Sequence, residues 1–155
     1  MTHFTSTLLD DFLGAGIEGR LDEDGDIIFM QNGFSYVLCF DEGDSNFGCL
    51  ILPNVWGVSD QQDARCALSA LNDINGRVKL AKGVLKEGQV SFVIELWLHD
   101  QVHWRHCMRR AQQTLVHALH LFADAMQEVV GAQQTVVKSA PGKNGAGLER
   151  GGKRE

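Results

Sequence analysis

Four histidines are the side chains whose type and spacing could support chemistry. His103 and His106 are three residues apart, as are His117 and His120, a spacing that can bring imidazoles together on a helix as metal ligands. On a helix all four fall within a sector of about 100° that also holds Arg110. An arginine repels a cation, and no Glu or Cys on that face completes a coordination shell. We therefore expect a solvated helix face with no functional metal site, with adventitious metal binding as the alternative. The sequence leaves open whether this His-rich face has any role.

The glycines in Gly14-x-Gly16-x-x-Gly19 match the dinucleotide-binding fingerprint as a string. That fingerprint needs a strand before the glycines and a helix after them, so that pyrophosphate sits at a helix N-terminus. Here the apolar spacing indicates a helix before the glycines and strands after them. We interpret the string as a glycine-terminated helix followed by a turn, and we expect no cofactor.

Three acids at alternate positions, Asp22, Asp24 and Asp26, resemble the start of a calcium loop. Position six of such a loop requires glycine and is Ile27 here, while the bidentate acid required at position twelve is Gly33. We therefore expect an acidic hairpin turn. No Ser/His/Asp or Cys/His spacing stands out elsewhere, so the sequence predicts no catalytic residues and no enzyme.

The four cysteines, at positions 39, 49, 66 and 107, form no C-x-x-C pair. No basic segment followed by an apolar one begins at Met1, so we interpret them as reduced thiols of a cytoplasmic protein. No apolar run approaches the ~18 residues needed to span a bilayer, and we expect no membrane partner.

The chain has the length of one domain, with 155 residues of which 44% are hydrophobic. Its net charge of −6 is unevenly spread, because residues 138–155 carry +3 and the preceding residues carry −9. An acidic body repels phosphate backbones, so nucleic acid is not the expected partner. We expect one folded domain over residues 1–137 and a disordered, Gly-rich basic tail over residues 138–155.

Apolar periodicity and turn signals predict an α+β fold in which an antiparallel sheet packs against helices. The expected elements are a helix over residues 4–13, three strands over 26–31, 34–41 and 47–53, a helix over 59–75, two (or three) strands over 78–98, and a last helix over 101–130. Asn32-Gly33 predicts a tight hairpin turn, because both residues accept positive φ. Pro53 is expected at a strand end or a sheet edge. A bulge is expected at Gly83, because it aligns the apolar faces of the last two strands.

This order of elements, with Leu71-Asn72-x-x-Asn75 closing the central helix and strands over Lys82–Lys86 and Val90–Leu98, resembles the YbjN family. That family is related in fold to the type III secretion chaperones, including the Tir chaperone group. The resemblance implies a small cytoplasmic protein that commonly forms a homodimer. The secretion chaperones of that fold group hold an extended segment of a partner protein.

We therefore expect a non-enzymatic protein-interaction module, chaperone-like or regulatory, that binds an extended partner segment at a sheet edge or in a helix–sheet groove. The alternative is a small-ligand sensor or enzyme with a pocket between sheet and helix. The sequence does not identify the partner. Candidate residues for the partner-binding or dimer surface are the large apolar side chains that one small core need not consume, together with the proline of the expected edge: Phe34, Phe47, Pro53, Trp56 and Trp97.

Overall fold

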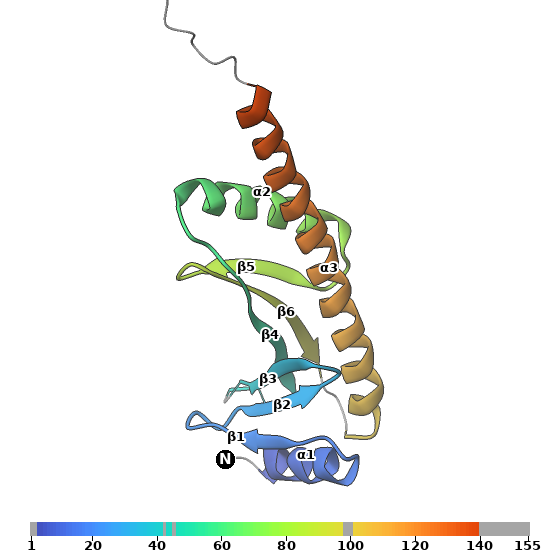
Figure 1. The fold of residues 1–155 in the computed structure, drawn as a ribbon. Coiled ribbons are helices and arrows are strands. Elements are labelled where there is room, and N and C mark those ends of the chain that lie inside the picture. The colour runs from blue at the N-terminus through green and yellow to red at the C-terminus, as the bar shows by residue number, and fades with distance from the viewer. Residues whose placement is uncertain (1–2, 42, 45, 98–100, 140–155) are drawn as a thin grey trace, which may run out of the picture.

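The computed structural model describes residues 3–41, 43–44, 46–97 and 101–139. Its elements, in chain order, are α1 (His3–Gly14), β1 (Gly19–Leu21), β2 (Ile27–Gln31), β3 (Phe34–Phe40), β4 (Phe47–Gly57), α2 (Gln61–Arg77), β5 (Lys82–Lys86), β6 (Gln89–Trp97) and α3 (Gln101–Ser139). The expected α+β fold is confirmed, and the three-residue strand β1 was not expected (Figure 1). Among the described residues, no helix is both long and apolar enough to cross a membrane.

One antiparallel sheet contains all six strands, in the order β1-β2-β3-β4-β6-β5. Side chains alternate between its two faces, and one face is buried beneath the helices. Each of the four middle strands contributes one residue to a row of directly paired apolar side chains: Ile27, Leu38, Leu50 and Ile94. Each of these four is at most 1% exposed, so this row is the centre of the core.

Two-residue turns set the register of two hairpins. Asn32 and Gly33, with φ of 52° and 81°, join β2 to β3, and Glu87 and Gly88, with φ of 52° and 75°, join β5 to β6. Positive φ at both central residues matches the right-handed twist of the strands. The predicted Asn-Gly hairpin is confirmed.

The helix α1 ends as the glycine string predicted. The backbone N–H of Gly16 donates to the carbonyl of Leu13 (3.0 Å), and that of Ile17 donates to the carbonyl of Phe12 (2.9 Å). With φ of +74° at Gly16, this is a Schellman ending, which satisfies carbonyls that the helix leaves unpaired. The glycines thus terminate a helix that leads into β1.

The bulge expected at Gly83 is wrong. β5 pairs with β6 without a break, from Lys82 opposite Val93 to Lys86 opposite Gln89. The strand begins at Lys82 because the residues before it form a turn, in which Leu80 has a φ of +70°. The bulge was expected because unbroken pairing would set polar residues before Lys82 opposite apolar residues of β6. Those residues lie outside β5, so no bulge is needed to align the apolar faces.

Close packing is what requires glycine at position 83. A Cβ built there would clash with the Leu71 side chain of α2 and would lie 2.7 Å from a ring carbon of Phe92. Atoms at such separations must move, so Gly83 lets α2 approach the sheet closely.

The expectation that Pro53 marks a strand end or an edge is also wrong. Pro53 lies within β4, which continues to Gly57 between β3 and β6, although the pairs with β3 run only from Gly48 to Ile51. The β4–β6 register shifts between Leu52 and Trp56, and the backbone N–H of Asn54 donates to Ser91 Oγ (3.0 Å) instead of to the ladder. A bulge tolerates a proline that a regular central strand excludes, and this is how β4 accommodates Pro53.

The predicted apolar stripe of α3 is confirmed from Met108 to Met126. The Phe122 ring meets those of Trp56 and Phe92 edge to face, with ring centroids 5.7 and 5.9 Å apart. The Trp104 side chain lies outside the described residues. α3 continues to Ser139, so residues 138 and 139 of the expected tail are helical, and the rest of that tail lies outside the described residues.

Candidate binding groove and the uncovered sheet face

A half-open groove of about 740 Å³ lies between α1 and α3, at the turn that joins β2 to β3. We call it the α1–α3 groove. The end of α1 and the turn after it contribute Phe12, Ala15 and Ile17, and the hairpin contributes Gln31, Asn32, Phe34 and Tyr36. The third wall is a single face of α3, made of Met108, Arg109, Gln112, Gln113, Val116, His117 and His120. Twelve residues of helix rise about 18 Å, which gives the length of this wall.

Stacked aromatic rings form the apolar side of the groove. Phe12 of α1 stacks on Phe29 of β2 with centroids 4.8 Å apart, and Phe29 stacks on Tyr36 of β3 at 5.3 Å. Phe34 continues the series by meeting Tyr36 edge to face at 6.4 Å. Burial raises the pKa of the Tyr36 hydroxyl. Because these rings link α1, β2 and β3, the apolar side is fixed by core packing.

One hydrogen bond ties α3 to the hairpin. Gln112 Nε2 donates to Gln31 Oε1 at 2.7 Å, and Gln112 is 9% exposed. The bond gives the buried amide of Gln112 a partner in the half-buried amide of Gln31. It holds the α3 wall at a fixed distance from the end of β2.

The polar side of the groove carries amides and basic groups. Arg109, His117 and His120 line it, all three are exposed, and no Asp or Glu is among the lining residues that the structure describes. The prediction that His117 and His120 face solvent is confirmed; the side chains of His103 and His106 lie outside the described residues. In the part of the chain that the structure describes, no group of three or more His, Cys, Asp or Glu is arranged to hold a metal ion.

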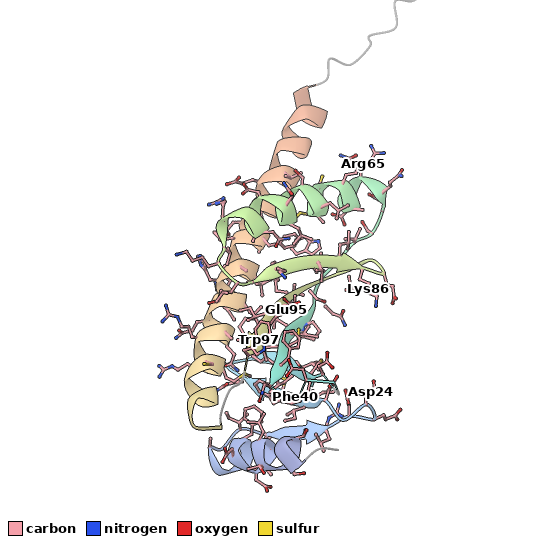
Figure 2. All side chains as sticks on the ribbon, turned by 180° about the vertical axis from the view of Figure 1, so that it is seen from behind. Asp24, Phe40, Arg65, Lys86, Glu95 and Trp97 are labelled. Atoms are coloured by element: carbon pink, nitrogen blue, oxygen red, sulfur yellow. The ribbon has the colours of Figure 1, made fainter. Side chains whose placement is uncertain are left out.

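A second surface, which we call the uncovered face, is the side of the sheet turned away from the helices. Its centre is a row of directly paired aliphatic residues, Ile28, Val37, Ile51 and Val93. Lys82 and Glu95 form an exposed ion pair of 3.1 Å beside this row. Glu95 and Trp97 are labelled on β6 in Figure 2, and Trp97 is 74% exposed. The face is therefore partly apolar and accessible.

Two half-buried thiols lie on the uncovered face, where Cys39 of β3 is directly opposite Cys49 of β4. Burial, followed by a hydrogen bond to Asp26, raises the pKa of Cys39 from 9.0 to about 12. Burial also raises the pKa of Cys49, with the nearby Glu95 adding to the effect. Both thiols are therefore protonated at neutral pH and are poor nucleophiles and ligands.

The outer edge of the sheet at β5 is partly closed. Asn75 of α2 accepts a hydrogen bond from the Gly83 backbone N–H (2.7 Å) and donates one to the Gly83 carbonyl (3.0 Å). These are the outward-facing backbone groups that an added strand would need. The opposite edge, β1, is only three residues long. Neither edge offers a long free ladder.

The predicted surface residues do not form one site. Phe34 lines the α1–α3 groove, whereas Phe47 and Trp97 meet edge to face at 5.5 Å on the uncovered face. Pro53 lies at the bulge of β4, and Trp56 packs on Phe122 beneath α3. Their assignment to a partner-binding or dimer surface stays a prediction.

Arg109 is a groove residue that the sequence reasoning passed over. A helical wheel places it about 20° from His120, so the signal was present in the spacing. The sequence does not show, however, that α1 and the β2–β3 turn face this side of α3, because that contact joins residues about 80 positions apart.

No protein-family model matches this chain, and no curated protein matches its sequence. Among solved structures, the chain is similar to YbjN of E. coli, which is described as a candidate transcription regulator. The TM-score is 0.59 with 16% sequence identity, over 79% of this chain and 92% of YbjN. The resemblance inferred from the order of the elements is therefore confirmed at the level of the fold: this chain has a YbjN-like fold.

Proposed function

We propose that this chain is a non-enzymatic interaction module that binds a segment of a partner protein in the α1–α3 groove. The observation that carries the proposal is the groove itself, which has a fixed aromatic side and follows a face of α3 for about 18 Å. An extended segment of five or six residues spans that distance at about 3.3 Å per residue. Grooves of this kind hold peptide segments through apolar anchors.

The state of the sheet edges favours partner binding in the groove over binding by strand addition. At β5, a partner strand would first have to displace Asn75 from both backbone groups of Gly83. A strand that bound there would exchange these two hydrogen bonds for two of its own, so it would gain less than at a free edge. The groove requires no such exchange.

The side chains in the groove support binding over catalysis. The described lining residues include neither a carboxylate nor a thiol, so they offer no pair of carboxyl groups and no Cys nucleophile. Amides and imidazoles beside aromatic rings suit the recognition of a peptide backbone and its side chains. The description of YbjN as a candidate transcription regulator is compatible with a regulatory role exerted through such binding.

Site-specific photo-crosslinking in the native host tests the proposal. A benzophenone side chain at Gln113, which is exposed and lines the groove, should crosslink to a protein partner, and proteolysis should map the crosslink to one short segment. Exposed Arg65 on α2 is the matched control, and exposed Met30 on β2 samples the uncovered face. Protein crosslinks from Met30 alone, or equal crosslinks from all three positions, would contradict binding in the groove.

A further inference from the structure

We infer that the segment held in the α1–α3 groove is amphipathic and acidic, with apolar anchors on one side and carboxylates on the other. This inference rests on the proposed function and specifies the chemistry of the partner. It follows from how charge is distributed between the groove and the rest of the chain.

Two basic groups of the groove, Arg109 and His120, lie along one line of α3. Arg109 and His120 are eleven residues apart, which places them about 16 Å apart along the helix and within about 20° around it. His117 lies between them along the axis of α3, about 60° around the helix from His120. In the part of the chain that the structure describes, Arg109 forms no ion pair. Among the described residues, its charge therefore has no ion-pair partner and lines the groove.

Acids are absent from the groove lining in the described part of the chain, although they outnumber bases in the chain as a whole. The sequence holds 20 Asp and Glu against 14 Lys and Arg, yet neither Asp11, beside Phe12, nor Asp124, one turn after His120, lines the groove. Charge complementarity across an interface selects partners and speeds their association. A basic line in an otherwise acidic protein selects carboxylates and rejects basic segments.

The two sides of the groove also fix how the segment is arranged. Ala15, Ile17 and Phe34 offer the partner an apolar surface above the buried rings of Phe12 and Tyr36, while Arg109 and the two imidazoles face it from α3. A segment with apolar and acidic residues on opposite sides satisfies both walls at once. A small molecule with a single carboxylate could contact only one of the basic groups, because Arg109 and His120 are about 16 Å apart. A phosphate backbone gains little from an aromatic wall with one arginine.

Selection from a displayed library of random 12-residue peptides, on the full-length chain, tests the inference. The enriched peptides should carry apolar anchors and a net negative charge of about −2 or lower. Arg109→Glu should reduce retention of these peptides roughly tenfold. Arg110→Glu should leave retention unchanged, because Arg110 is also exposed but does not line the groove. Gln113→Trp, which fills the groove with a larger side chain, should retain none of these peptides. Position 113 is exposed, so the variant is expected to fold, and a circular dichroism spectrum that matches wild type excludes misfolding as the cause.

The outcomes separate the inference from the function on which it rests. Enriched peptides that are neutral or basic, but are lost with Gln113→Trp, overturn the acidic chemistry and leave binding in the groove intact. If Arg109→Glu and Arg110→Glu reduce peptide retention equally, the inference is also overturned. Retention would then depend on the net charge of the chain and not on a basic group in the groove. Peptides retained equally by wild type and Gln113→Trp overturn the groove as the binding site. If only acidic peptides depleted of apolar residues are enriched, the aromatic half of the inference is wrong.

Discussion

The side-chain amide of Asn75 pairs with the backbone of Gly83 as a strand would, accepting from its N–H at 2.7 Å and donating to its carbonyl at 3.0 Å. Asn75 lies in the last turns of α2, and Gly83 lies in the edge strand β5. One side chain thus closes part of a sheet edge and also fixes the end of a helix to that edge. Exposed edges invite association with other chains, so the pair is expected to protect the fold as well as to stabilise it.

We predict that Asn75→Ala lowers the free energy of unfolding by about 1–3 kcal/mol, because it leaves two partly buried backbone groups without partners. Asn75→Asp keeps the acceptor but loses the donor, so its effect should be intermediate. Chemical denaturation measures both. Asn72→Ala is the control, since Asn72 is an exposed amide in the same helix, and an equal loss there would show that helix propensity and not the edge is responsible. Asn75→Ala should also raise light scattering at high concentration.

We predict opposite effects for two glycine-to-alanine substitutions. Gly83→Ala should destabilise by about 1–3 kcal/mol, because the new methyl group overlaps Leu71 and Phe92. Gly76→Ala should stabilise by roughly 0.5–1 kcal/mol, because Gly76 is within α2 and a Cβ there meets nothing within 4 Å. Thermal or chemical unfolding of the two variants distinguishes these signs. A Gly83→Ala variant as stable as wild type would contradict the close approach of α2 to β5.

We predict that Gln31 and Gln112 are coupled by about 1 kcal/mol, the usual net value of a partly buried hydrogen bond. A double-mutant cycle with Gln31→Ala and Gln112→Ala measures this coupling in denaturant. A control cycle combines Gln31→Ala with Gln113→Ala. Gln113 is the exposed neighbour of Gln112, so this coupling should be near zero. Additive effects in the first cycle would show that the hydrogen bond does not position the α3 wall.

Much of the fold follows from local signals in the sequence. The turns at Asn32-Gly33 and Glu87-Gly88 need positive φ at both residues, and the stripe on α3 repeats every three or four residues; each of these is a short-range property. The interpretations that were wrong concern long-range contacts. Gly83 is required by Leu71 of the packed helix, and no pattern within the strand reports that contact. Pro53 follows the rule that sheets confine proline to edges or bulges, but the sequence could not choose between the two.

The candidate site was harder to predict than the fold. The groove exists because α1 and the β2–β3 turn come to face α3, and the aromatic stack from Phe12 through Phe29 to Tyr36 fixes that arrangement. The sequence showed the His-rich face of α3 but not what lies opposite to it. A binding site assembled from three elements is visible only once tertiary packing is known.

The raised pKa of Cys39 predicts a loss of stability at alkaline pH. Burial and the bond to Asp26 raise this pKa to about 12, from 9.0 for an unperturbed thiol. Between these values the unfolded chain releases the proton and the folded chain keeps it, so the stabilising contribution is complete below pH 9 and is lost progressively as the pH rises toward 12. The difference in unfolding free energy between wild type and Cys39→Ala should therefore shift in favour of the variant from pH 8 to pH 11. Ser35→Ala, at an exposed position of the same strand, should show no such trend because serine does not titrate. A difference for Cys39→Ala that does not vary with pH would show that the thiol is solvated and that its surroundings do not oppose ionisation.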